Sequence, residues 1–576
     1  MKSFFKILTV ALAAFSLSGC SDFLEENNKT NFTTDVIYST ADGVESLVNS
    51  CYTPIRFWYG KEGGYAFTEL GTDIILAASG CTHTPLAQYH PTDLNGTNSN
   101  SKAYWERFYA AVNYCNMALQ YIPDSQLDET VKTRRQGEVH FLRAFYLWHI
   151  VETWGNVYLS LEANTDPVTT ATRTAVEGFY DQIMEDLSDA VDLLKNVTAN
   201  DGGRVTLHAA KAFKARMLLT RASASYINNS NRANDYAEAA VLAKEVIGSG
   251  NFELAQDYAS IWSMDNSDGD LNKEVVWFVN YTQNFTITSD IPQYESSSSF
   301  RKEGGHQAHL HFCMKYDDQP GMTRDPRNGR PFNRYMPSLH YLQLFDATID
   351  QRYAGSLKMA WYANSKDKVE AAQAKDYPGM TLNDTSIFIV QGIATDQQKA
   401  LAKNRYQLLD SKSIYDNGHD KVLNNKQTPQ LSKFDDPTRS ASDETRSKRD
   451  AFVIRIAEMY LIVAEAEMDS NPAEALSHVN ILRKKRAIPG KEADMEVTAS
   501  DLNIDFILAE RARELGGEQL RWFDLKRTGK LLEYVQTWNP DGKANIKDYH
   551  TVRPIPQSQL DAVTNKDEFK QNPGYN

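Results

Sequence analysis

The chain has 576 residues, a length that accommodates three or four domains or a single large one. Its formal net charge is −14, with 41% hydrophobic and 24% charged residues, a composition typical of folded rather than disordered proteins. The acidic balance argues against nucleic-acid binding, which needs a basic face, and against electrostatic docking on an anionic membrane.

The first twenty residues resemble an export signal. Lys2 and Lys6 precede an apolar run, residues 7–17, which is too short to span a bilayer and fits the core of a secretory signal peptide. The run ends in Leu-Ser-Gly before Cys20, which resembles a bacterial lipobox. This resemblance implies that residues 1–19 are removed, that Cys20 carries a lipid and that residues 20–40 form an anchor and tether. The alternative is an ordinary signal peptide with an incidental cysteine.

The remaining chain shows no second membrane segment. Removal of residues 1–19 takes away two lysines and no acids, so the formal charge becomes −16. No later stretch approaches 18 uninterrupted apolar residues, which predicts a protein that is anchored at a membrane and not inserted in it. Four further cysteines match no zinc-binding spacing and could be paired or free in an exported chain: Cys51, Cys81, Cys115 and Cys313.

Apolar residues recur at helical spacing through the first half of the chain. The first such face consists of Trp105, Phe108, Val112, Cys115, Leu119 and Ile122. Two more fall within residues 137–148 and 180–194. Residues 207–226 and 236–247 then predict an alanine-rich helix pair that Gly248 ends. A short buried strand is predicted over residues 274–281.

Helical patterns return near the C-terminus. Residues 456–467 predict one helix, and Asn471-Pro472 provides the N-cap and first position of the next. Asp501 is the predicted N-cap of a last helix, which Gly516 and Gly517 end. Paired helices of this length are typical of tetratricopeptide-like units, in which each pair hides its apolar face against a neighbouring pair, although no strict repeat occurs.

Long polar segments separate the two helical regions. Residues 282–345, 363–385 and 410–450 are rich in turn-forming residues, and loops of this length are usually functional or disordered. Residues 410–450 are predicted to form a solvated loop. The basic run at residues 483–486 is interpreted as a solvated helix face.

The sequence lacks the short motifs of the common enzyme classes. Asn266, Asp268 and Asp270 begin like a calcium loop, but the required glycine and final acid are missing. The best metal candidates are His306, His309, His311 and Cys313; the last three would fall on one side of an extended segment, although an ordinary polar loop is the preferred interpretation. We predict no metal, no cofactor and no catalysis.

Several motifs occur in order along the mature chain. Residues 510–518 read Glu-Arg-Ala-Arg-Glu-Leu-Gly-Gly-Glu and lead into Arg-Trp-Phe-Asp-Leu-Lys-Arg-Thr-Gly at 521–529. Arg-Pro-Ile-Pro-Gln at 553–557 and Gln-Asn-Pro-Gly-Tyr at 571–575 close the chain. Together with the lipobox, this set resembles the SusD/RagB family of surface nutrient-binding lipoproteins.

The resemblance implies a mainly α fold: a right-handed helical scaffold of four tetratricopeptide-like helix pairs with a loop-rich, few-stranded portion packed on it. A single domain would cover residues 41–576. Its scaffold would cover about 41–260 and 451–535, and its ligand-facing portion about 261–450. The C-terminal motifs are interpreted as scaffold, with Glu510, Arg511, Arg513 and Glu514 pairing with Arg521 or Asp524.

The family also implies a function. Such proteins bind oligosaccharide or polysaccharide nutrients at the outer membrane and deliver them to a partner SusC-like TonB-dependent transporter. Three alternatives remain: a peptide or other non-sugar nutrient in the same system, a surface glycan hydrolase with an unrecognised carboxylate pair, and a helical interaction scaffold without a small-molecule site.

A glycan site would combine aromatic rings with hydrogen-bonding side chains. The family builds its site from loops after the early helices and from the central loop-rich region, and Thr72-Asp73 resembles a Thr-Asp element of the family. The candidate ligand-binding residues are Trp58, Tyr59, Asp73, His83, Tyr89, Tyr294, Arg324 and Trp361. For each aromatic residue, packing in the core or within a loop is the alternative.

Overall fold

The computed structural model describes residues 34–281, 305–416 and 419–575. The predicted signal peptide, Cys20 and Tyr294 lie outside the described residues. No helix in these three ranges combines the length and apolarity needed to cross a membrane.

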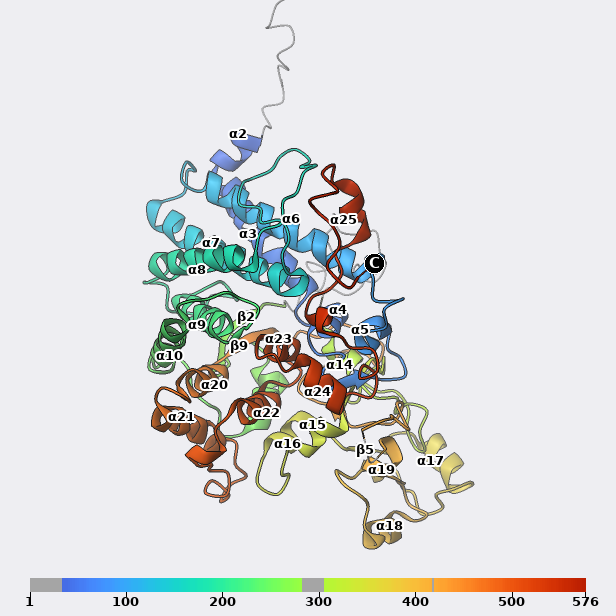
Figure 1. Ribbon diagram of the computed structural model, residues 1–576. Coiled ribbons are helices and arrows are strands. Elements are labelled where there is room, and N and C mark those ends of the chain that lie inside the picture. The colour runs from blue at the N-terminus through green and yellow to red at the C-terminus, as the bar shows by residue number, and fades with distance from the viewer. Residues whose placement is uncertain (1–33, 282–304, 417–418, 576) are drawn as a thin grey trace, which may run out of the picture.

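Four pairs of helices stack side by side to form the scaffold (Figure 1). They are α3 (Ala41–Tyr52) with α6 (Ser99–Tyr121), α7 (Glu129–Trp154) with α8 (Val176–Leu193), α9 (Leu207–Ser223) with α10 (Arg232–Ile247), and α20 (Ile456–Glu467) with α21 (Pro472–Lys485). Successive pairs touch through α6 and α7, α8 and α9, and α10 and α20. The predicted mainly α scaffold with few strands is confirmed.

Shorter helices complete the described chain. Those before the central region are α2 (Thr34–Ser39), α4 (Glu62–Thr68), α5 (Thr84–Gln88) and α11 (Tyr258–Ile261). The central ones are α14 (Ala308–His311), α15 (Leu339–Gln343), α16 (Arg352–Ser356), α17 (Lys366–Gln373), α18 (Asp396–Ala402) and α19 (Ser411–Ile414). Those near the C-terminus are α22 (Ile504–Leu515), α23 (Arg521–Arg527), α24 (Leu531–Trp538) and α25 (Gln557–Ala562).

The helix ends follow from local capping. Asn98 accepts hydrogen bonds from the backbone N–H groups of residues 100 and 101 at the start of α6, and Thr206 accepts one from Ala209 at the start of α9. The predicted cap at Asp501 is wrong by two residues. Asn503 caps α22 by accepting from the Phe506 N–H, whereas Asp501 belongs to a preceding 3-10 turn.

The strands form small sheets, of which two lie wholly within the loop-rich region. β1 (Ile75–Ala77) pairs with β3 (Tyr335–Pro337), β4 (Leu357–Lys358) with β8 (Gln430–Leu431), and β5 (Ala360–Tyr362) with β6 (Thr385–Ile389), which in turn pairs with β7 (Gln407–Leu409). β2 (Val275–Val279) confirms the predicted buried strand. Its antiparallel partner is β9 (Ala451–Arg455), and this pairing brings the fourth helix pair against the third.

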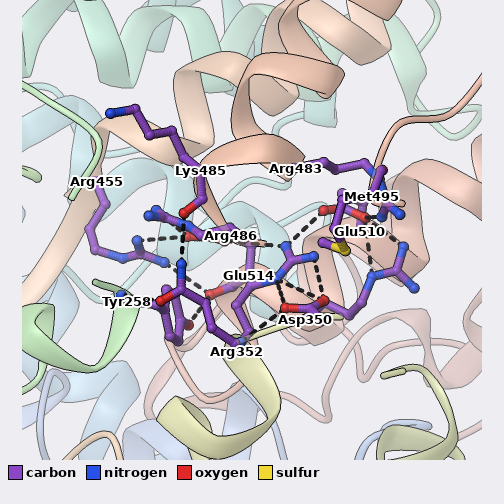
Figure 2. Close-up of polar contacts among 12 residues, drawn as sticks. Tyr258, Asp350, Arg352, Arg455, Arg483, Lys485, Arg486, Met495, Glu510 and Glu514 are labelled. Carbon is purple, nitrogen blue, oxygen red and sulfur yellow. Dashed lines mark hydrogen bonds and ion pairs between the residues drawn. The ribbon is translucent and has the colours of Figure 1, made fainter. Parts of the chain in front are cut away.

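A network of buried charges holds the C-terminal motif in place. Figure 2 shows three arginine side chains around Glu514 of α22, one each from α16, β9 and the end of α21. Glu514 lies 2.9 Å from Arg486, 3.0 Å from Arg455 and 3.3 Å from Arg352. All four side chains are fully buried. Because these ion pairs join four separate elements, the motif serves as scaffold, as predicted.

The partners within this network differ in part from the prediction. Arg511 does pair with Asp524, at 2.7 Å, but Glu510 pairs with Arg352 at 2.7 Å and Arg483 at 2.6 Å. The interpretation of residues 483–486 as a solvated face is wrong for Arg486, which is buried and also contacts Glu274. The Arg486 guanidinium compensates the buried negative charges of Glu274 and Glu514.

The prediction of a solvated loop over residues 410–450 is wrong for part of its last third. Asp436, Ser447 and Arg449 are buried. The Ser447 hydroxyl donates to Asp436 at 2.6 Å, and Arg449 donates to the Trp262 carbonyl at 2.6 Å. Hydrogen bonds within the segment and to the Trp262 carbonyl outside it accompany the burial of these polar groups.

Glu69 is a fully buried carboxylate that accepts hydrogen bonds from the backbone N–H groups of Gly517 and Leu520. Burial raises its pKa to about 7, despite these hydrogen bonds. The folded protein therefore retains a proton that the unfolded chain loses near its ordinary pKa of about 4.3. This contribution to stability is present below that pH and is lost as the pH rises to 7.

We therefore expect Glu69→Gln to flatten the pH dependence of stability between pH 4.5 and 7. The glutamine keeps one acceptor oxygen but cannot lose a proton. The measurement is the urea midpoint at half-unit pH intervals, with Glu533→Gln, an exposed carboxylate, as the control. Parallel profiles for Glu69→Gln and the parent would contradict the assignment.

Candidate functional site

The aromatic residues predicted near the early helices lie in the core. Trp58 packs against Tyr104 and His149, with ring centroids 5.0 and 4.9 Å apart. Tyr59 and Tyr89 are also buried, and the Tyr89 hydroxyl donates to the Gly71 carbonyl. The prediction that these three rings contact a ligand is wrong, because helices and loops of the scaffold already cover them.

Asp73 is a structural residue. It is fully buried and receives two hydrogen bonds from Arg521, at 2.8 and 2.6 Å. Burial alone would raise the pKa of Asp73, but the Arg521 guanidinium and its hydrogen bonds outweigh this and hold the pKa below the usual range. The predicted ligand role of Asp73 is therefore wrong; its carboxylate neutralises a buried cation.

His83 is almost completely buried. Its Nδ1 lies 3.4 Å from Glu62, whose carboxylate also contacts Arg334 at 3.0 Å. The imidazole is directed into this polar cluster and offers little surface to a ligand.

The histidine segment does not form the predicted extended arrangement. His309 and His311 lie in the short helix α14, and both are buried with His306 and Cys313. Burial lowers the pKa of all three histidines, which keeps the rings neutral. Within the described residues, no three histidine, cysteine, aspartate or glutamate side chains are placed to hold a metal ion.

Two adjacent aromatic residues of strand β5 differ in the exposure of their side chains. Trp361 is 0% exposed, whereas Tyr362 is 46% exposed and is the most exposed aromatic side chain that the structure describes. Successive side chains of a strand point to opposite faces, so the core side of β5 takes Trp361 and the outer side presents Tyr362. The buried Trp361 ring therefore offers no surface to a ligand, contrary to the prediction, whereas the Tyr362 ring does.

Tyr362 lines a cavity of about 270 Å³ in the loop-rich region. The other lining residues are Asp325, Arg327, Asn328, Ala363, Asn364 and Asn383. They come from the turn at residues 325–329, from the end of β5 and from the loop before β6. This cavity, the Tyr362 pocket, is the candidate binding site.

Hydrogen bonds fix one wall of the Tyr362 pocket. Asp325 accepts from the backbone and side-chain N–H groups of Asn328 through Oδ1, and from the Asn364 amide through Oδ2 at 2.6 Å. Asn364 also exchanges hydrogen bonds with the backbone of Thr323. These side chains shape the wall before any ligand arrives.

The groups left for a ligand are an aromatic ring, a cation and an amide. The Arg327 guanidinium lies 6.0 Å from the centroid of the Tyr362 ring. Asn383 adopts a left-handed backbone conformation, with φ at 66°, while its N–H donates to the Ala363 carbonyl. An aromatic face beside polar donors suits a sugar, which has apolar C–H faces and hydroxyl groups.

Arg324, the remaining predicted residue, lies next to this pocket in sequence but does not line it. Its guanidinium pairs with Asp317 at 2.8 Å. The residues that sequence reasoning missed are Arg327, Tyr362 and Asn383. For Tyr362 the usable signal was the alternation around Trp361: if one of the two rings is buried in a strand, its neighbour faces outward.

A second cavity, of about 330 Å³, lies beside β2 and is less suited to a sugar. Its polar groups are already engaged: Arg204 with Glu138 at 2.7 Å, and Arg56 with the Asn280 carbonyl. Its tryptophan, Trp277, is buried, as predicted, and donates to the Gly203 carbonyl.

Known sequences resemble this chain along almost its whole length. Residues 273–575 match the model of the SusD family, and residues 22–219 match a model described as starch-binding associating with outer membrane. A SusD-like protein of Formosa agariphila is 23% identical over 570 residues, which cover 96% of each chain. The starch-binding protein SusD of Bacteroides thetaiotaomicron is 21% identical over 508 residues, covering 84% of this chain and 80% of that one.

Solved structures share the fold. A laminarin-binding SusD-like protein superposes with a TM-score of 0.66 at 20% identity, covering 93% of this chain and 100% of the other. A SusD homologue from Bacteroides thetaiotaomicron gives a TM-score of 0.69 at 20% identity, with 94% and 98% covered. The helical scaffold with small sheets is common to all of them.

Proposed function

Because the chain belongs to the SusD family, we propose that it binds an oligosaccharide or polysaccharide nutrient and delivers it to a SusC-like TonB-dependent transporter of the outer membrane. The resemblance found in the sequence motifs is thus confirmed at the level of the family. The relatives are binding proteins and not enzymes, in agreement with the prediction of a non-catalytic protein.

The observation that carries the proposal is the exposed ring of Tyr362 in a preformed polar pocket. Relatives named for binding starch and laminarin support a glycan ligand. A model named for association with the outer membrane supports the location, and we place the anchor at Cys20, where lipidation would hold the protein at the cell surface.

The test is glycan binding by the chain from residue 21, which retains every described element. We expect Tyr362→Ala to weaken the affinity for a bound polysaccharide on the order of tenfold or more, because a central aromatic anchor is removed. Tyr362→Phe, which keeps the ring, should retain most of the affinity. Binding is measured by affinity electrophoresis and calorimetry against a panel of polysaccharides and peptides.

Leu401→Ala is the matched control, since Leu401 is an exposed residue of α18 in the same region but does not line the pocket. Equal glycan affinity of Tyr362→Ala and the parent would contradict the site. Binding of peptides alone, or turnover of a bound glycan, would contradict the function.

A further inference from the structure

The turn that builds the Tyr362 pocket is basic, although the protein as a whole is acidic. Residues 324–334 contain four arginines and one acid in a chain whose net charge is −14. Arg324 pairs with Asp317 and Arg334 pairs with Glu62. Within the described residues, Arg327 and Arg330 have no carboxylate within 4 Å and contact only aromatic rings, those of Tyr362 and Phe332.

Cations behind the pocket wall are also without carboxylate ion pairs in the described part of the chain. Lys358 donates to the Asn328 side-chain oxygen at 2.8 Å. Arg439 donates to the backbone carbonyls of Pro326, Asp436 and Glu444. The hydrogen bonds from Lys358 to Asn328 and from Arg439 to Pro326 hold residues of the turn. They place two further positive charges beside it.

The acids nearby are engaged elsewhere. Asp325, the acid in the pocket lining, accepts from Asn328 and Asn364 with its two oxygens. Asp384 pairs with Arg405 at 3.2 Å. Asp435 accepts a hydrogen bond from the Gln430 side-chain amide. Exposed Arg327 is therefore the charged group of the pocket that a ligand can reach without displacing a hydrogen bond or an ion pair made by the described residues.

We propose that the Tyr362 pocket selects glycans with acidic substituents, a carboxylate or a sulfate, which Arg327 binds through its guanidinium while Tyr362 packs on the sugar ring. This inference rests on the proposed function. A planar guanidinium can donate two parallel hydrogen bonds to either oxyanion, and charge-assisted bonds of this kind are stronger than bonds to neutral hydroxyls. The acidic remainder of the protein would repel a polyanion and leave this face as the favourable contact.

The test compares matched glycans that differ only in charge. Polygalacturonate is paired with its fully methyl-esterified form, and dextran sulfate with dextran, so that the two pairs distinguish uronate from sulfate. We expect the parent chain to bind at least one acidic glycan about tenfold more tightly than its neutral counterpart. Added salt should weaken that binding.

Arg327→Gln should remove this preference, because it should weaken the binding of acidic glycans more than the binding of their neutral counterparts. Arg327→Lys, which keeps the charge without the planar fork, should retain part of it. Arg405→Gln is the control, because Arg405 is exposed in the same region and already paired with Asp384.

Equal binding of charged and neutral partners, or an unchanged preference in Arg327→Gln, would overturn the inference. If neutral glycans still bind and still require Tyr362, the proposed function stands while the acidic specificity fails. If no glycan binds, or binding is indifferent to Tyr362, the proposed function and this inference both fail.

Discussion

Replacement of Glu514 by glutamine should destabilise the protein by about 3–5 kcal/mol. Glu514 is fully buried and lies within 3.3 Å of three buried arginines (Figure 2). An amide of the same shape removes one negative charge that all three guanidinium groups share, in a region that water cannot reach. Arg352 would keep Asp350 and Glu510, Arg455 would keep Glu274 and Glu518, and Arg486 would keep only Glu274. The loss of stability follows from this weakened charge compensation and not from a cavity.

The measurement is urea unfolding of the chain from residue 21, followed by circular dichroism and by tryptophan fluorescence. The control is Glu533→Gln, since Glu533 is an exposed partner of Lys530 and its loss should cost less than about 1 kcal/mol. A change of similar size in the two variants would show that the ion-pair network contributes little to stability.

Replacement of Trp58 by alanine should cost about 3–5 kcal/mol of stability and leave glycan affinity unchanged. The indole is 1% exposed and packs against four neighbouring rings, so truncation leaves a large cavity in the core. The sequence alone predicted the opposite outcome, a loss of binding at this position.

Tyr362→Ala provides the reciprocal comparison. Its ring is half-exposed, so stability should change by less than about 1 kcal/mol while the glycan affinity falls on the order of tenfold or more. Thermal unfolding and affinity electrophoresis on both variants separate the two roles. A binding defect in Trp58→Ala at temperatures where the variant is folded would place the ligand near the early helices after all.

Features encoded by local patterns could be predicted from the sequence. The helix faces, the buried strand β2 and the glycine that ends α22 depend on neighbouring residues, and they were found within a few positions. Features that depend on contacts with residues distant in sequence could not be predicted. Nothing near Arg486 indicates that its basic run would enter the core to meet Glu274, 212 residues away.

Prediction of the candidate site was limited in the same way, because burial of its residues depends on contacts distant in sequence. Trp58 stands between Phe57 and Tyr59, and Tyr89 occurs among polar residues. Neither pattern shows that residues distant in sequence cover both rings. In the central loop-rich region, where the Tyr362 pocket lies, the sequence analysis named Trp361 and not its neighbour Tyr362. The orientation of β5, which turns Tyr362 outward, depends on its pairing with β6.

The pairing of β2 with β9 also constrains the order in which the protein can fold. The first three helix pairs consist of contacts between neighbouring segments and can assemble early, whereas the fourth pair docks only after a loop of roughly 170 residues has closed, at an entropic cost. The contact between Arg521 and Asp73 spans 448 residues and must form later still. The Tyr362 pocket lies inside the closed loop, so a chain truncated before β9 would have the first helix pairs but no closure around its binding site.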